Sequence, residues 1–212
     1  MGRINVANEI EDTSRYIKCM QEVRARLKLI ESVTAKQLTT GQPFSDVEFV
    51  FLQLRKILEL IAFASLSANK EQYSAAHAKF ATHWNAKRML ADLEKVNPDF
   101  YPTPSAPPVV QPDKTKHVPA IAGGFLTKDD FVLLYDKCGE ILHARNPFTD
   151  KPLTVNVLYP VTEWVSRIRT LLDLHLMHLH GGNKWIVQVP KEGEIHIWLA
   201  KPYTSWPAKE RK

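Results

Sequence analysis

The segment DVEFVFLQLRKILELIAFASLSAN, residues 46–69, decides the fold of this chain. Apolar side chains lie on almost every face of the helix that it would form, which is typical of a helix enclosed by other elements. Ser45 offers an N-cap, and Glu48 follows it at the spacing of a capping box. The segment therefore predicts a central, buried helix that begins near Ser45.

Amphipathic helices are predicted before and after this segment. Apolar residues recur there at steps of three and four, charged residues occupy the other faces, and Gly or Pro follows each stretch. Thr127 and Asp130 form a second capping-box pattern, at the start of one of these helices. The four expected helices cover residues 6–34, 72–96, 127–146 and 160–180.

The remaining segments are predicted to be extended. Residues 97–124 contain seven of the 14 prolines, so we expect a connection with little regular structure. Apolar and polar residues alternate in KWIVQV and EIHIWLA, residues 184–189 and 194–200, which predicts an antiparallel hairpin. The predicted fold class is mainly α, a helical bundle with a C-terminal β-hairpin. Its expected parts are a three-helix part, the proline-rich connection, the completing helices, and the hairpin with its tail, over residues 1–96, 97–124, 125–182 and 183–212.

Composition indicates an ordinary globular protein. Of the 212 residues, 44% are hydrophobic and 24% charged. No apolar run approaches the ~18 residues of a membrane span, and the first residues are too polar for a signal peptide, so we expect no membrane partner. Cys19 and Cys138 lie far apart, which is typical of two reduced thiols and predicts a cytoplasmic location. The net charge of +5 is spread along the chain and permits contact with nucleic acid without requiring it.

Two groups of polar residues have structural and functional interpretations. Arg55 and Glu59 are four residues apart in the apolar helix, which predicts an ion pair on one face; alternatively, Glu59 meets Lys137 or Arg145 from another helix. His175 and His178 could chelate a metal from one face of the last helix, but a helix C-terminus favours histidines without any metal. We expect neither a metal site nor a cofactor.

The stretch LLYDKCGEILHARNPF, residues 133–148, contains the strongest candidates for catalysis. It reads as a helix that ends on His143, Arg145 and Asn146, with Lys137 more than one turn upstream. A histidine beside cations is suited to metal-independent RNA cleavage, because it moves a proton while the cations stabilise the charged phosphorane.

This arrangement resembles the higher eukaryotes and prokaryotes nucleotide-binding (HEPN) family of small helical bundles. The family motif is an arginine, four to six residues, then a histidine, and an apolar helix like LRKILELIAFASL, residues 54–66, often precedes it. Lys137 here replaces the arginine and Cys138 replaces the polar residue that usually follows, so the planar fork that grips phosphate is lost. Arg169 and His175 are a second match to the motif. The chain also looks like a group of bacterial helical proteins without an assigned activity.

The resemblance implies a protein that binds or cleaves RNA, in a toxin or phage-defence context, and that works as a homodimer. In such an endoribonuclease, His143, Arg145 and Lys137 would be catalytic, and Arg55, Glu59 and Asn146 would bind substrate across a shared cleft. The alternative is a non-catalytic helical module that binds a protein partner. In that case His143 should be an exposed helix cap on which no other polar groups converge.

Overall fold

The structure is a computed structural model that describes residues 6–76, 85–112, 116–144, 148 and 158–201. It is mainly helical, with an antiparallel sheet formed chiefly by the C-terminal part of the chain, which agrees with the predicted fold class. Buried residues from the helices and the sheet form one cluster, from Tyr16 in the first helix to Ile195 before the last strand. Among the described helices, none has both the length and the apolar content that crossing a membrane requires.

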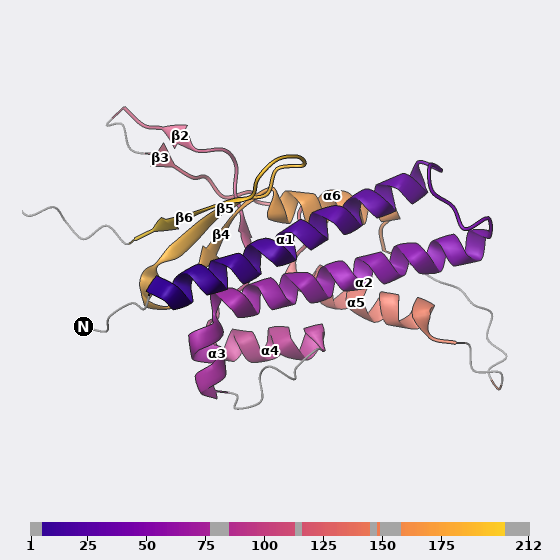
Figure 1. The fold of residues 1–212 in the computed structure, drawn as a ribbon, viewed down its shortest axis with the longest axis horizontal. Helices are drawn as coiled ribbons and strands as arrows, with labels where there is room; N and C mark the ends of the chain where they lie inside the picture. Colours follow the sequence, from indigo (N-terminus) through magenta and orange to yellow (C-terminus); the bar gives the residue numbers. More distant parts are fainter. Residues whose placement is uncertain (1–5, 77–84, 113–115, 145–147, 149–157, 202–212) are drawn as a thin grey trace, which may run out of the picture.

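A long antiparallel pair of helices forms the spine of the molecule. Helix α1 covers Val6–Thr34 and helix α2 covers Pro43–Ala68, and the two lie side by side along the long axis (Figure 1). The prediction that α2 is central is confirmed, because it also packs against α4 and α5. The predicted start at Ser45 is wrong. The N-cap is Gln42 and Pro43 opens the helix, since its fixed φ suits the first turn and its missing N–H leaves no donor unpaired.

The next helices complete the helical side. Helices α3 (Lys70–Ala76) and α4 (Ala86–Val96) occupy most of the stretch predicted as one helix over residues 72–96, and residues 77–84 of that stretch lie outside the described residues. Helix α5 covers Lys128–Leu142 and packs against α2. Its predicted capping box is confirmed. The Thr127 side chain accepts from the Asp130 N–H, and the Asp130 side chain accepts from the Thr127 N–H.

The last predicted helix is wrong in its second half. Helix α6 covers Val161–Leu172, and the chain then forms strand β4 over Leu174–His178. Burial alternates along β4, so His175 and Met177 face the core while Leu174, Leu176 and His178 face the other way. His175 and His178 therefore lie on opposite faces and cannot chelate one metal ion together. A strand forms here rather than a helix, because the backbone of β4 pairs along its full length with β5.

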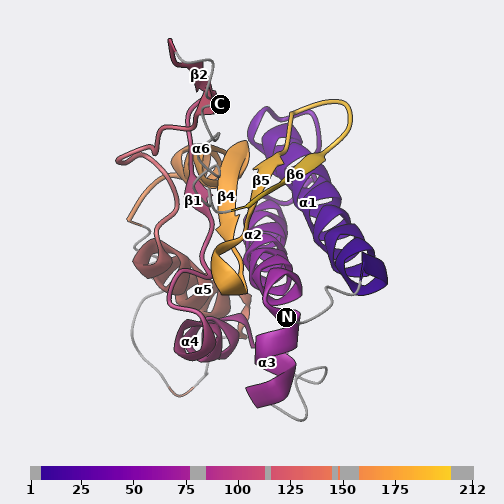
Figure 2. The same ribbon diagram turned by 90° about the vertical axis from the view of Figure 1, so that its left-hand side faces the viewer.

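The predicted hairpin is part of a larger sheet. Strands β5 (Lys184–Gln188) and β6 (His196–Ala200) are its two predicted strands, and the sheet order is β1-β4-β5-β6, all antiparallel. Strand β1 (Thr103–Pro104) comes from the proline-rich connection, which is therefore anchored on the sheet. The sheet lies beside α1 (Figure 2). On its inner face, the Trp185 ring contacts the Tyr16 ring of α1 edge to face.

The proline-rich connection also carries a separate two-stranded ribbon. Strands β2 (Val109–Val110) and β3 (Lys116–His117) pair only with each other among the described strands. Both views show the ribbon extending away from the helices and the four-stranded sheet (Figures 1 and 2). The predicted lack of regular structure in the connection thus holds for most of its length, with three very short strands as exceptions.

Candidate functional site

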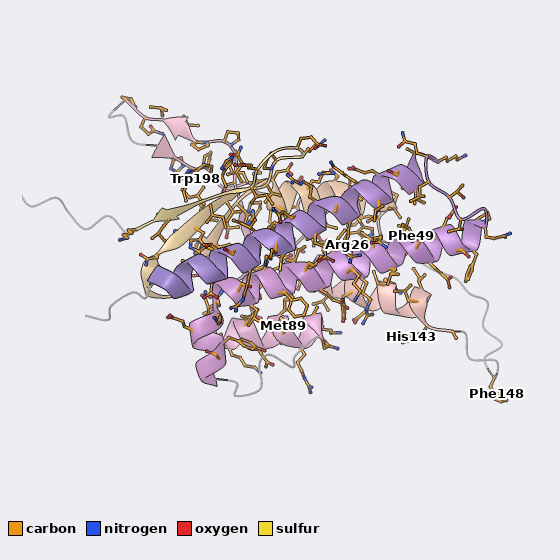
Figure 3. All side chains as sticks on the ribbon, viewed as in Figure 1. Arg26, Phe49, Met89, His143, Phe148 and Trp198 are labelled. Carbon is orange, nitrogen blue, oxygen red and sulfur yellow. The ribbon has the colours of Figure 1, made fainter. Side chains whose placement is uncertain are left out.

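His143 lies at the C-terminal end of α5 and is exposed to solvent (Figure 3). It is the C-cap residue, and its backbone N–H donates to the Gly139 carbonyl at 3.1 Å. Its imidazole makes no hydrogen bond or ion pair within the described chain. The two other candidates from this helix end, Arg145 and Asn146, lie outside the described residues.

Lys137 is held by its own helix. Its ammonium lies 2.7 Å from the Glu140 carboxylate, one turn further along α5. An ammonium already paired with a carboxylate is partly neutralised, so its attraction for a phosphate is reduced. The described part of α5 thus places no unpaired cation in hydrogen-bond contact with His143.

Arg55 and Glu59 form the ion pair that their spacing predicted. The Arg55 Nε atom lies 3.3 Å from Glu59 Oε1, and Lys56 approaches the second carboxylate oxygen at 3.1 Å. Arg55 also reaches α5, where its Nη2 donates to the Tyr135 hydroxyl at 3.0 Å and its guanidinium carbon lies 4.5 Å from the Tyr135 ring centre. The charges on the central helix are therefore satisfied by an ion pair and a cation–π contact.

The two helices of the predicted cleft, α2 and α5, pack against each other. Arg55 approaches the backbone of α5 at Gly139, where a Cβ would stand 3.5 Å from its Nη1. Gly139 is one turn before His143, yet no described hydrogen bond or ion pair joins His143 to Arg55 or Glu59. Of the groups that would have to converge on a phosphate, Lys137, Arg55 and Glu59 are each engaged with other residues.

The second motif match, Arg169 and His175, is divided between two elements. Arg169 on α6 is paired with Glu31 of α1, with its Nε and Nη2 atoms 3.0 and 2.8 Å from one carboxylate oxygen. His175 on β4 is completely buried, so it cannot touch a substrate. The motif spacing in the sequence therefore does not bring these two side chains to one accessible site.

His175 instead joins the sheet to α1. Its Nε2 lies 2.5 Å from the Tyr16 hydroxyl, and its Nδ1 lies 2.9 Å from the Leu172 carbonyl. A carbonyl only accepts, so Nδ1 carries the proton and the Tyr16 hydroxyl donates to Nε2. Burial lowers the pKa of His175 to about 4, and burial raises the pKa of Tyr16, so both groups are neutral near pH 7.

A groove that the sequence did not predict lies on the outer face of the sheet. Its volume is about 710 Å³. Ile186 and Trp198 of the sheet, Pro107 and Pro108 of the proline-rich connection, and Lys191 of the β5–β6 turn contribute to its lining. Most of the lining is apolar, with Ser105, Thr170, Asp173, Gln188 and Lys191 as its polar members. Grooves of this size and composition commonly bind ligands.

A row of side chains that crosses the outer face of the sheet contributes Ile186 and Trp198 to the groove. Leu176, Ile186 and Trp198 are direct cross-strand partners, and partners of this kind share one face. Trp198, labelled in Figure 3, is 48% exposed. Its ring stacks on that of His196 with the ring centres 5.6 Å apart. The alternation in EIHIWLA places Trp198 and His196 on one face, which is the one signal in the sequence that points to this surface.

Strand β6 is one edge of the sheet. Among the described strands it pairs with β5 alone, so the backbone groups on its other side have no strand partner. Leu199, which faces away from the groove, is also 40% exposed. An edge strand of apolar residues beside an apolar groove presents both backbone and side-chain binding groups.

Basic residues on the helices are mostly neutralised. Ion pairs with carboxylates engage the cations Arg15, Arg26, Lys28, Arg55, Lys56, Lys70, Lys87, Lys95, Lys128, Lys137, Arg167 and Arg169. These pairs partly neutralise the positive charge of the described helices.

Comparison of the chain with protein-family models, with curated proteins and with solved structures found no match in any of the three.

Proposed function

We propose that this protein is a non-catalytic interaction module that binds an extended segment of polypeptide at the outer face of its sheet. The observation that carries the proposal is the groove of about 710 Å³ beside the edge strand β6. The site combines the half-exposed indole of Trp198 with backbone groups that lack a strand partner within the described chain. The sequence allowed a non-catalytic module that binds a protein partner. The groove offers a binding surface for such a partner, on the sheet rather than on a face of the helical bundle.

The chemistry of the surface favours a polypeptide. An extended peptide supplies backbone donors and acceptors for β6, and its alternate side chains point toward one face of the sheet. Apolar side chains on that face would lie against Ile186 and Trp198. A tryptophan at the centre of an apolar site is a frequent source of binding energy in protein interfaces.

Support for an RNA-cleaving site is weaker. His143 is an exposed helix cap, Lys137 is paired with Glu140, and Arg55 is paired with Glu59 and Tyr135. Cleavage needs a proton-transfer group and charge-stabilising groups within reach of the same phosphate. Binding of RNA bases on the Trp198–His196 pair is a separate outcome that the experiment below distinguishes.

The experiment selects ligands and then locates their site. A phage-displayed library of random linear peptides is selected on the immobilised full-length protein, and the enriched peptides are synthesised. We expect apolar residues to alternate in them, and we expect Trp198→Ala to weaken their binding by at least ~tenfold, about 1.4 kcal/mol. The matched control is Phe44→Ala, which removes a ring that is 60% exposed at the start of α2.

Two results would contradict the proposal. In the first, Trp198→Ala binds the selected peptides as tightly as the unchanged protein. In the second, fluorescein-labelled single-stranded RNA binds with strong salt dependence while no peptide is enriched, which would assign the stacked aromatic pair to nucleic acid. Fluorescence polarisation of labelled peptides and RNA under the same buffer conditions separates the two.

A further inference from the structure

The β2–β3 ribbon is an exposed apolar element. Val109 and Val110 are 52% and 63% exposed, the largest values among the valines of the described chain. The two strands have two residues each and pair with each other, outside the four-stranded sheet. A two-stranded ribbon alone in water is marginally stable at best, so this one requires a surface that covers its valines.

The ribbon stands on a stiff stalk. The Ala106 N–H donates to the Pro119 carbonyl at 2.8 Å, the Ile121 N–H donates to the Pro104 carbonyl at 3.1 Å, and Ser105 and Ala120 form an antiparallel bridge. Pro107 and Pro108 follow on one side of the stalk, and their rings fix φ. Bending the ribbon back over the sheet of its own chain would disrupt this paired stalk.

The groove on the sheet is the complementary feature. Pro107 and Pro108 of the stalk line its rim, while Ile186 and Trp198 form part of its apolar wall. The ribbon therefore begins beside the groove. From there it extends away from the four-stranded sheet and the helices (Figures 1 and 2). A second copy of the chain brings both a ribbon and a groove, so one two-fold arrangement can cover both exposed apolar features at once.

We propose that the groove receives the β2–β3 ribbon of a second copy of this chain, with Val109 and Val110 of one copy against Trp198 and Ile186 of the other. This inference rests on the proposed function, because it names the polypeptide that the groove binds. The exchange is reciprocal, so the assembly closes as a dimer and does not extend into a fibre. A foreign peptide that binds the groove must displace the ribbon, and so it dissociates the dimer.

The first test is the mass in solution. Sedimentation velocity up to ~100 μM detects a dissociation constant of that order or tighter, and we expect the mass of two chains. Val110→Asp is expected to raise the dissociation constant by at least ~tenfold, because it brings a carboxylate into an apolar groove. Phe44→Asp is the matched control, since Phe44 is equally exposed but lies at the start of α2, and it should leave the dimer intact.

The second test is disulfide trapping between two variants. Protein with Val110→Cys is mixed with protein with Gln188→Cys, which places a thiol at the groove, and the mixed disulfide is identified by mass spectrometry. We expect this linked pair, and none with Thr40→Cys in the exposed α1–α2 connection. A disulfide within one chain that carries both Val110→Cys and Gln188→Cys would overturn the inference, because it shows the ribbon closing on its own groove.

The experiments distinguish an absence of the ribbon-exchanged dimer from an absence of peptide binding at the groove. A single-chain mass at every concentration, or a dimer unaffected by Val110→Asp, overturns the ribbon exchange. Neither result touches the loss of peptide binding in Trp198→Ala, which tests the groove itself. If the exchange is correct, a selected peptide that binds the unchanged protein shifts its mass toward that of one chain.

Discussion

Tyr16 and His175 show how single residues couple the two halves of the fold. They lie 159 positions apart in the sequence, are both completely buried, and join α1 to β4 through one hydrogen bond. The same histidine is fixed from the other side by the Leu172 carbonyl at the end of α6. Both partners use neutral groups, so the contact avoids the cost of a buried charge.

This pair makes stability depend on pH. The pKa of His175 is lowered from 6.5 to about 4 by burial, so the unfolded state takes up a proton at a higher pH than the folded state. The stabilisation is complete above pH 6.5 and is lost as the pH falls toward 4, at up to about 1.4 kcal/mol per pH unit. Urea unfolding at pH 7, 6 and 5 measures this slope.

The control for the slope is His175→Gln, which removes the titrating group. The variant is expected to be less stable at pH 7, and its stability should fall less steeply between pH 6.5 and 4 than that of the unchanged protein. Equal slopes for the two proteins would show that His175 does not cause the acid sensitivity.

His143 gives the opposite prediction at the same scale. Its side chain is exposed and makes no hydrogen bond within the described chain, so His143→Ala should leave the melting temperature nearly unchanged. The HEPN resemblance predicts that the unchanged protein cleaves single-stranded RNA and that the variant does not. The interaction-module account predicts no cleavage by either protein. Cleavage that disappears in His143→Ala, followed on labelled RNA by gel electrophoresis, would contradict the proposed function.

At the scale of elements, the two capping-box patterns had different outcomes. Thr127 and Asp130 form both reciprocal hydrogen bonds at the start of α5, whereas Ser45 lies inside α2 because Pro43 already opens that helix. Both patterns satisfied the same spacing rule. The difference is the proline upstream of Ser45, whose preference for the first helical turn moves the helix start.

The difference can be measured with a matched pair of substitutions. Thr127→Ala removes a side-chain acceptor from the Asp130 N–H and should lower the free energy of unfolding by about 1 kcal/mol. Ser45→Ala removes no cap and should change that free energy by less than about 0.5 kcal/mol. Chemical denaturation of both variants checks this. A larger loss for Ser45→Ala than for Thr127→Ala would contradict the assigned helix starts.

Helices with a long apolar period were predictable, and the α6–β4 boundary was not. In residues 171–179, LLDLHLMHL, apolar residues fit both a helical and an alternating period. The choice depends on backbone pairing with β5 and β1, which the local pattern does not contain. The error of placing His175 on a helix with Arg169 followed directly from this ambiguity.

At the scale of the whole molecule, the Arg55–Glu59 pair was predictable and the groove was not. The ion pair depends on four-residue spacing within one helix. The groove instead brings together the proline-rich connection, the end of α6, strands β4 to β6 and the β5–β6 turn. Only the outward position of Trp198 on a strand was contained in the local sequence, because the remaining neighbours depend on how distant segments pair.

The two functional interpretations differ in the residues on which they rely. The expected site on α2 and α5 relied on residues near one helix end, of which Arg145 and Asn146 lie outside the described chain. The groove relies on described residues of the sheet and its surroundings. We therefore propose that the sheet is the recognition surface and that α2 and α5 support it.

Hydrogen–deuterium exchange with a bound peptide tests this claim most directly. A peptide selected on the protein is added in excess, and amide exchange is followed by mass spectrometry. The account predicts that exchange slows by at least ~tenfold in β6, His196–Ala200, where a bound strand supplies partners for the free backbone groups. It predicts no change at residues 138–143, at the C-terminal end of α5. Protection at the end of α5 with unchanged exchange in β6 would contradict it.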